Sequence, residues 1–184
     1  MARIESKMME LGSKAHDFKL FSPSENKEIS LTNMKSEKAT LIIFISNHCP
    51  FVKHLNSALS TFAKKYIPKG LSVIAINSND IVNYPDDSPE NMIKQSKEFD
   101  FHFPYLFDET QEIAREYGAM CTPDFFLYDG DLKLRYRGQF DDSRPGNSIP
   151  VTGIDLSIAV DALLNNKLPS TDQKPSVGCG IKWK

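Results

Sequence analysis

The chain has 184 residues, which is the size of one domain that can bury its own hydrophobic core. With 40% hydrophobic and 25% charged residues, its composition is that of an ordinary globular protein. The 22 Lys and Arg residues nearly balance the 24 Asp and Glu residues, for a net charge of −2. This balance argues against a nucleic-acid partner or an anionic membrane surface, because both need a concentrated cationic face.

Nothing in the sequence suggests a membrane partner or export. The longest uninterrupted apolar run covers residues 41–45, far short of the roughly 20 residues that a membrane span needs. The N-terminal residues have neither an apolar core nor a small-residue cleavage site, which an export signal would need. Three widely spaced cysteines do not make a disulfide framework. These features predict a cytoplasmic protein.

The expected strands and helices alternate along the chain. In order, they are a hairpin of strands at 16–21 and 28–31, a buried strand at 39–45, a helix at 50–66, a buried strand at 71–77, a helix starting at 88–90, a strand at 105–107, a helix at 110–117, a hairpin of strands at 124–128 and 132–137, and a helix from a capping box at 152–155 to 165. This order predicts an α/β fold with a mixed sheet that is largely parallel at its centre.

One loop carries the candidate chemistry. Residues 46–50 (SNHCP) join the buried strand at 39–45 to the helix that follows it. In open parallel sheets, chemistry collects at the carboxyl ends of strands, where loops meet helix N-termini. A thiol in the first turn of a helix lies near unpaired backbone N–H groups and the positive end of the dipole. We therefore expect the pKa of Cys49 to lie below the ~8.5 of a free cysteine, with His48 adding positive charge when protonated.

A second segment, residues 118–123 (GAMCTP), comes directly before the strand at 124–128. A bond to proline at the entry of a strand can be cis, but only about 5–6% of such bonds are. From the residues alone, Pro123 is an ordinary strand start. Cys121 is then a small apolar residue at the strand entry.

Together these segments and the order of elements resemble the thioredoxin fold, and more narrowly the thioredoxin-like proteins of the AhpC/TSA (peroxiredoxin-related) group. The resemblance spans nearly the whole chain and rests on residues 47–54 (NHCPFVKH), 84–90 (YPDDSPE), 121–126 (CTPDFF), 136–145 (YRGQFDDSRP) and 178–184 (GCGIKWK). It implies a central mixed sheet flanked by helices, with an N-terminal β-hairpin extension. It also implies one thioredoxin-like domain at residues 1–168 and a C-terminal tail at residues 169–184. Pro123 becomes the cis-proline that faces the active-site thiol.

The sequence departs from the family pattern at position 46, where Ser46 replaces the first cysteine of a Cys-x-x-Cys pair. Exchange between two thiols in that motif is excluded, because a serine hydroxyl has no disulfide state. In the peroxiredoxin branch, however, a Ser or Thr three residues before the Cys-Pro pair is the working arrangement, in which the cysteine attacks peroxide and the hydroxyl supports it. Ser46 and Cys49 have that spacing.

The peroxiredoxin pattern is itself incomplete in this chain. Ile43 stands where those enzymes have a proline, and the loop at 121–123 lacks their arginine. A cation near the sulfur would stabilise the thiolate and polarise peroxide. The arginines left to supply one are Arg135, Arg137 and Arg144.

The first functional hypothesis is a thiol oxidoreductase of antioxidant type, built on Cys49. Oxidation would give a sulfenic acid, which a second thiol resolves to a disulfide. Cys121 is one candidate resolver, through the cis-proline loop. Cys179 is the other, because a flexible tail can reach the site at modest loop-closure cost. The substrate would be a peroxide or a protein thiol or disulfide, with no cofactor and no metal; the sequence does not indicate an oligomeric state.

Two other hypotheses remain open. In the first, the fold survives as a binding module that has lost its dithiol chemistry through Ser46 and binds extended peptides by backbone pairing beside the cis-proline. In the second, a metal site is formed by His48, Cys49, His54 and Cys121, although neither Cys-x-x-Cys nor His-x-x-x-His is present. The acidic residues Asp86 and Asp87 lie in turn-rich sequence, where aspartate usually caps a turn.

Overall fold

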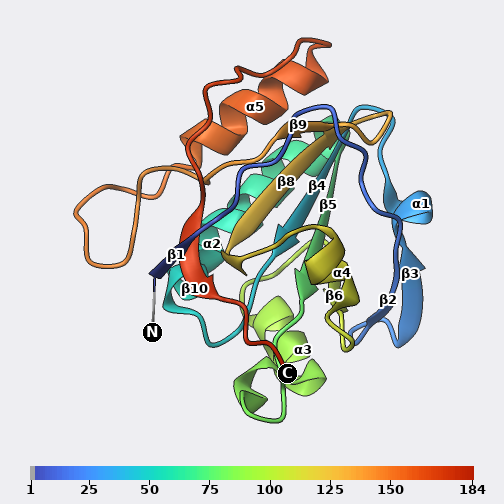
Figure 1. The fold of residues 1–184 in the computed structure, drawn as a ribbon, viewed down its shortest axis with the longest axis vertical. Helices are drawn as coiled ribbons and strands as arrows, with labels where there is room; N and C mark the ends of the chain where they lie inside the picture. The colour runs from blue at the N-terminus through green and yellow to red at the C-terminus, as the bar shows by residue number, and fades with distance from the viewer. Residues whose placement is uncertain (1–2) are drawn as a thin grey trace.

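The computed structural model describes residues 3–184, and a mixed sheet of seven strands lies at its centre (Figure 1). Its middle strands are parallel to one another, and antiparallel strands extend it on both sides. In spatial order the strands are β3 (Lys27–Ser30), β2 (Lys19–Ser22), β6 (Tyr105–Phe107), β5 (Leu71–Asn77), β4 (Ala39–Phe44), β8 (Asp124–Asp129) and β9 (Leu134–Tyr136). The expected α/β class, with a mixed sheet and an N-terminal hairpin, is confirmed.

A second, smaller sheet brings the two ends of the chain together. Its antiparallel strands, in spatial order, are β1 (Arg3–Glu5), β10 (Val177–Gly180) and β7 (Cys121–Thr122). The segment expected to be a flexible tail therefore contributes the middle strand of a sheet. Neither β1 nor β10 is expected from the sequence, because both are short and pair only with segments far away along the chain.

Helices cover both faces of the large sheet. On one face α2 (Pro50–Tyr66) and α5 (Ile154–Leu164) share a hydrophobic cluster with the strands, and α4 (Glu112–Glu116) packs into the cluster on the other face (Figure 1). The remaining helical segments are α1 (Leu31–Met34), α3 (Pro89–Glu98) and the 3₁₀ turns η1 (Ile67–Lys69) and η2 (Pro85–Asp87).

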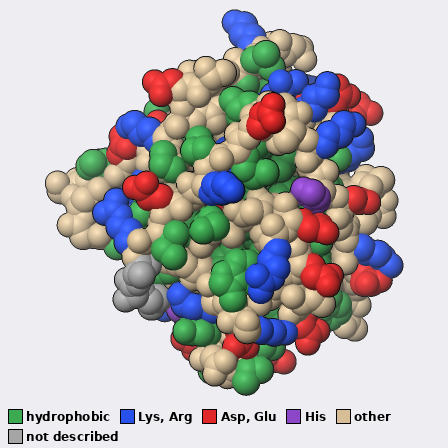
Figure 2. Space-filling model, viewed as in Figure 1, with side chains coloured by type: hydrophobic (Ala, Val, Ile, Leu, Met, Phe, Trp, Pro, Cys, Tyr) green, Lys and Arg blue, Asp and Glu red, His purple; other side chains and the backbone are tan. Residues whose placement is uncertain are grey.

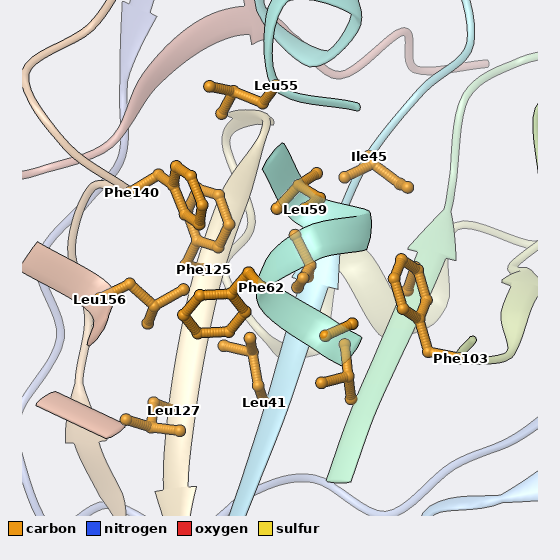
Figure 3. Close-up of a cluster of buried hydrophobic side chains, with 14 of the residues drawn as sticks. Leu41, Ile45, Leu55, Leu59, Phe62, Phe103, Phe125, Leu127, Phe140 and Leu156 are labelled. Atoms are coloured by element: carbon orange, nitrogen blue, oxygen red, sulfur yellow. The ribbon is translucent and has the colours of Figure 1, made fainter. Parts of the chain in front are cut away.

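The central strand β4 shows how this double cover arises from the sequence. Leu41 and Ile43 join the cluster with α2 and α5, whereas Ile42 and Phe44 join the cluster on the opposite face. Side chains alternate across a strand, so a strand covered on both faces needs a continuous apolar run. Figure 3 shows the first cluster, in which Phe62 of α2 packs above the strands.

Helix α2 is held on the sheet by one buried stripe, which fixes the loop at its N-terminus. The buried apolar residues are spaced three and four apart, as the sequence predicts: Val52, Leu55, Leu59, Phe62 and Tyr66. After α2, the turn η1 ends at Gly70, whose φ of 108° suits a glycine.

Of the two helix starts expected from capping residues, one is confirmed and one is wrong. The Ser88 side chain accepts a hydrogen bond from the Asn91 N–H, with proline in the first helical turn of α3. The capping box at 152–155 does not form, because α5 begins at Ile154 after Gly153 at φ 63°. The Asp141 carboxylate accepts the backbone N–H groups of Thr152 and Gly153 instead, each at 2.6 Å.

Acidic and basic side chains are interspersed on the face of the molecule drawn in Figure 2, in keeping with the balanced composition. Among residues 3–184, the structure contains no helix both long and apolar enough to span a bilayer.

Candidate active site

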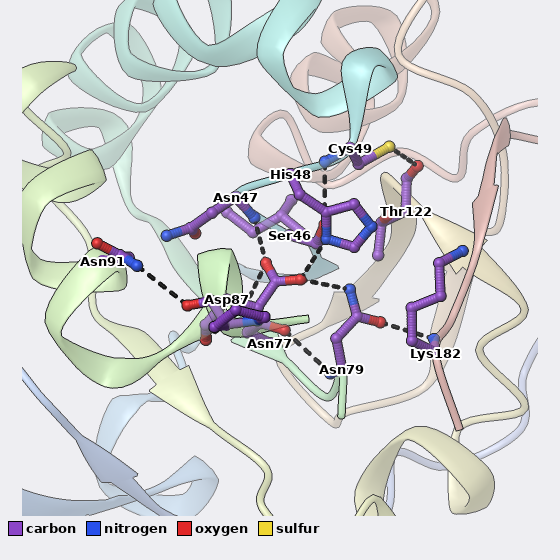
Figure 4. Close-up of polar contacts among 12 residues, drawn as sticks. Ser46, Asn47, His48, Cys49, Asn77, Asn79, Asp87, Asn91, Thr122 and Lys182 are labelled. Carbon is purple, nitrogen blue, oxygen red and sulfur yellow. Dashed lines mark hydrogen bonds and ion pairs between the residues drawn. The ribbon is translucent and has the colours of Figure 1, made fainter. Parts of the chain in front are cut away.

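Cys49 is the N-cap residue of α2, and Pro50 is the first residue of the helix. The first turn of α2 contains no acidic residue. The Cys49 side chain is completely buried, and its Sγ lies 3.0 Å from the backbone oxygen of Thr122 (Figure 4). The Thr122–Pro123 bond is cis, as the resemblance implies. The loop before α2 and the cis-proline loop thus meet at one sulfur atom.

The pKa of Cys49 is lowered to about 6. Hydrogen bonding with the Cys179 side chain has the largest effect and outweighs burial, which raises the pKa. The Thr122 side chain and the Val52 backbone also lower it. The direction expected from the helix N-terminus is therefore correct, but a second thiol contributes more than the helix does. This shift favours the thiolate form of Cys49, the nucleophilic form of a cysteine.

The second thiol comes from the tail. Cys179 lies on β10 opposite Thr122, and only 2% of its surface is exposed. Its hydrogen bond with Cys49 and its burial both raise its pKa. The two sulfurs compete for one proton, so Cys179 stays protonated while Cys49 ionises.

Cys121 has no comparable contact with Cys49. It pairs with Gly180 on β10, one position along β7 from the pair of Thr122 and Cys179. Successive residues of a strand point to opposite faces, so the Cys121 side chain faces away from those of Thr122 and its partner Cys179. Burial raises the pKa of Cys121, and its Sγ lies 3.7 Å from the Pro123 oxygen. The structure brings together Cys49 and Cys179, and the Cys121 side chain lies on the opposite face of β7.

Ser46 supports the loop. Its buried hydroxyl accepts a hydrogen bond from the Cys49 backbone N–H at 3.2 Å and lies 3.5 Å from Nδ1 of His48. This contact fixes the turn that carries Cys49, whereas the resemblance to the peroxiredoxin branch implies support of the cysteine in its reaction with peroxide.

His48 is held by an acidic partner that sequence reasoning missed. Its Nδ1 lies 2.5 Å from Oδ2 of Asp87, a carboxylate with no solvent exposure (Figure 4). The same carboxylate accepts hydrogen bonds from the Asn47 backbone and from the side chains of Asn77 and Asn79. Burial raises the pKa of Asp87, but the hydrogen bonds, led by that from His48, outweigh it and hold the pKa below its usual range.

A stacking contact holds the face of the His48 imidazole. The His48 ring stacks on Tyr84, with centroids 5.2 Å apart and planes 16° apart. Its Nε2 is buried and has no hydrogen-bond partner among residues 3–184.

Asp87 illustrates what the sequence does and does not reveal. The turn expected around it is present as η2, which ends at Asp87. Its carboxylate, however, reaches the loop at 46–50, a contact that no local pattern specifies. The only signal was its place in the family segment at 84–90.

The arginines considered for the site are engaged elsewhere. Arg137 forms a fully buried ion pair with Asp124, and Arg135 pairs with Asp129. The Arg144 guanidinium donates hydrogen bonds to the backbone oxygens of Asp141 and Ser143 and to the side chain of Gln139, all within the loop that carries Arg144. The charge of Lys182, in the tail, opposes the rise in the pKa of Cys179.

The residues suggested for a metal do not form one cluster. His48 is bound to Asp87, and His54 Nε2 lies 2.7 Å from the Ser143 hydroxyl. Across residues 3–184 no group of three or more His, Cys, Asp or Glu side chains is arranged to hold a metal ion.

Comparison with known proteins places this geometry in a family. Residues 11–137 match the AhpC/TSA family, well over half of the chain. The chain belongs to the AhpC/TSA family. It is 29% identical over 126 residues to the thiol-disulfide oxidoreductase ResA of Bacillus thuringiensis, with 68% of each chain covered. Family membership and this relative support a redox function in general terms.

Solved structures similar to this AhpC/TSA protein include two without an assigned function. An uncharacterized conserved protein from Geobacillus kaustophilus is 54% identical, with a TM-score of 0.98, 100% of this chain and 97% of that chain covered. A hypothetical protein from Sinorhizobium meliloti is 48% identical, with a TM-score of 0.95 and 98% of each chain covered. A secreted disulfide oxidoreductase from Mycobacterium tuberculosis is 18% identical, with a TM-score of 0.61, covering 79% of this chain and 96% of that one. This last likeness shows the shared thioredoxin fold.

Proposed function

We propose that the protein is a thiol–disulfide oxidoreductase whose redox pair is Cys49 and Cys179. The observation that carries the proposal is the placement of two buried thiols around Thr122: its oxygen lies 3.0 Å from Cys49 Sγ, and Cys179 pairs opposite it on β10. The pKa values of the two thiols shift in opposite directions. One thiol is prepared as the nucleophile and the other is kept protonated. The tail thereby supplies the second cysteine that Ser46 removes from the Cys-x-x-Cys position.

The reaction starts at the Cys49 thiolate, which attacks one sulfur of a substrate disulfide. The substrate S–S bond breaks, a Cys49 mixed disulfide forms, and the other substrate sulfur leaves as a thiolate that takes up a proton. Cys179 then loses its proton and attacks Cys49 Sγ, which releases the second substrate thiol. The substrate gains two electrons, the protein holds a Cys49–Cys179 disulfide, and an external dithiol or thiol reduces it for the next turnover.

The pKa of Cys179 suits the second step. The largest cause that raises it is the hydrogen bond with Cys49, and the Cys49 charge acts in the same direction. Both causes disappear once Cys49 Sγ is in an uncharged mixed disulfide. The pKa of Cys179 therefore falls at the stage when it has to become the nucleophile.

The surrounding residues act as positioning groups in this proposal. Ser46 fixes the Cys49 backbone, and cis-Pro123 follows the Thr122 carbonyl that contacts the sulfur. His48, oriented by Asp87, holds the residue before Cys49 in place. A protein disulfide or thiol is a better substrate than a peroxide, because the three candidate arginines are bonded elsewhere. The lowered pKa of Cys49 also argues against a binding module with an inert thiol.

A disulfide-reduction assay tests the proposal. With dithiothreitol as the electron source and insulin as the substrate, the wild-type protein should accelerate reduction, and Cys49→Ser should return the rate to that without protein. Cys121→Ser is the matched control, because it also removes a buried thiol, and it should stay within about twofold of wild type. Equal rates with wild type and Cys49→Ser would contradict the proposal.

A further inference from the structure

We infer that the C-terminal segment Val177–Lys184 is a built-in competitor for the partner polypeptide. This inference rests on the proposed function. The segment occupies the edge of β7 through which an extended, cysteine-bearing partner would reach Cys49. Such a partner enters when the segment leaves, and an occupant in the same register must have glycine directly before its cysteine.

Backbone pairing places the segment on this edge. Strand β10 runs antiparallel to β7, with Cys179 opposite Thr122 and Gly180 opposite Cys121. Strand β7 leads directly into cis-Pro123, and the exposed edge of a strand is where an extended peptide adds by main-chain hydrogen bonds. With β10 in place, Cys49 has no solvent exposure. A disulfide of another protein therefore cannot reach Sγ while β10 stays paired.

The fit of Gly178 sets the selectivity. A Cβ atom at position 178 would lie 2.0 Å from the Thr122 oxygen and 2.6 Å from its carbonyl carbon. Both are backbone atoms of β7, so they cannot move aside as a flexible side chain would. Any other strand that takes this register brings the residue before its cysteine to the same place, and only glycine fits there.

Beyond the strand, the segment is fastened at the surface by contacts that do not involve the thiols. The Ile181 N–H donates to the Met120 oxygen, and the Gln111 side chain bonds to the backbones of Lys182 and Lys184. The Trp183 ring stacks with the Arg115 guanidinium at 4.3 Å. Part-exposed contacts at a chain end open more readily than core contacts do. They can be removed while Cys49 and Cys179 stay in place.

One amide connects the docked segment to the active-site loop. Asn79 accepts a hydrogen bond from the Lys182 N–H at 2.8 Å and donates to the Asp87 carboxylate at 2.9 Å (Figure 4). Departure of the segment leaves Asn79 without its Lys182 partner, and Asn79 in turn helps to hold Asp87 against His48. Asn79 thus links docking of the tail to the pair formed by Asp87 and His48.

The test compares two chains in which Cys49 is the only thiol: one of full length with Cys121→Ser and Cys179→Ser, and one with Cys121→Ser that ends at Ser176 and therefore lacks β10. Each is mixed with a peptide whose cysteine is disulfide-bonded to thionitrobenzoate, in the sequences Val-Gly-Cys-Gly-Ile and Val-Ala-Cys-Gly-Ile. The Cys49 thiolate attacks the peptide cysteine sulfur, the S–S bond breaks, and the coloured thionitrobenzoate anion leaves.

Shortening should raise the rate with the Gly-Cys peptide at least about tenfold, and the shortened chain should prefer that peptide over the Ala-Cys peptide by about tenfold. Trp183→Ala in the full-length chain is a milder second variant, for which a rise of about threefold is expected. Equal rates for full-length and shortened chains, or no preference between the peptides, would overturn the inference.

A small disulfide, 5,5′-dithiobis(2-nitrobenzoate), separates this inference from the proposed function. If it modifies Cys49 in the shortened chain while the peptides show no acceleration, only the inference is overturned. If Cys49 fails to react with it in the shortened, folded chain, the proposed function fails.

Discussion

Cys179→Ser should reduce catalysed disulfide turnover by about 100-fold or more and leave Cys49 trapped in a mixed disulfide with its substrate. Cys49 can still attack, but the thiol that contacts it and completes the exchange is gone. The serine hydroxyl can still donate a hydrogen bond to Cys49 Sγ but cannot form a disulfide, so the first step is retained and only the second is lost. Insulin reduction measures turnover, and intact-protein mass spectrometry under non-reducing conditions measures the trapped species.

Cys121→Ser provides the control for this result. Cys121 is as buried as Cys179, but its place on β7 turns it away from the pair. We expect turnover close to wild type and no trapped intermediate. A full loss of turnover with Cys121→Ser, together with normal turnover of Cys179→Ser, would show that the cis-proline loop carries the resolving thiol.

Asp124→Ala should lower the free energy of unfolding by about 3–5 kcal/mol, a large part of the 5–15 kcal/mol typical of a domain. Asp124 and Arg137 are both without solvent exposure, and they bond through two nitrogen–oxygen contacts. Removal of the carboxylate leaves a buried guanidinium without a counter-ion. Asp124 also accepts the Met120 N–H at 3.1 Å, so the cis-proline loop loses support. Urea denaturation measures the change.

The double variant Asp124→Ala/Arg137→Met is the matched control. It removes both charges, and the methionine can pack on the Phe126 ring, over which the guanidinium now lies at 3.9 Å. We expect its stability to return to within about 1–2 kcal/mol of wild type. A double variant as unstable as Asp124→Ala would show that the stabilisation comes from another feature than the paired charges.

The parts of the fold that local patterns specify could be predicted from the sequence. The apolar run of β4 and the apolar stripe of α2 follow the pattern of buried residues in each element. Both elements therefore lie close to where the sequence predicts them. The place of Cys49 at the start of α2 follows from the same pattern. Strand β10 could not be predicted, because two of its four residues are glycines, which are unfavourable in strands, and its pairing partners lie far away in the sequence.

In the site, too, local patterns predict some features, and contacts between distant segments decide the others. Sequence reasoning left Cys121 and Cys179 open as the partner of Cys49, and the choice depends on which face of a two-residue strand each side chain takes. The sequence predicts Asp87 to be a turn residue, and η2 is such a turn. Its contact with His48 depends on how η2 packs against the loop at 46–50, which is a property of the tertiary structure.

Titration of the Cys49 thiolate by its absorbance at 240 nm tests the central claim, that Cys49 and Cys179 act as a pair. In the wild-type protein absorbance should rise with a midpoint at about pH 6, and Cys49→Ser should remove this step. Cys121 and Cys179 stay protonated in this range, because their pKa values are raised. Cys179→Ala should move the midpoint of Cys49 to higher pH, so that less thiolate is present at pH 7. A midpoint that is the same with and without Cys179 would contradict the account.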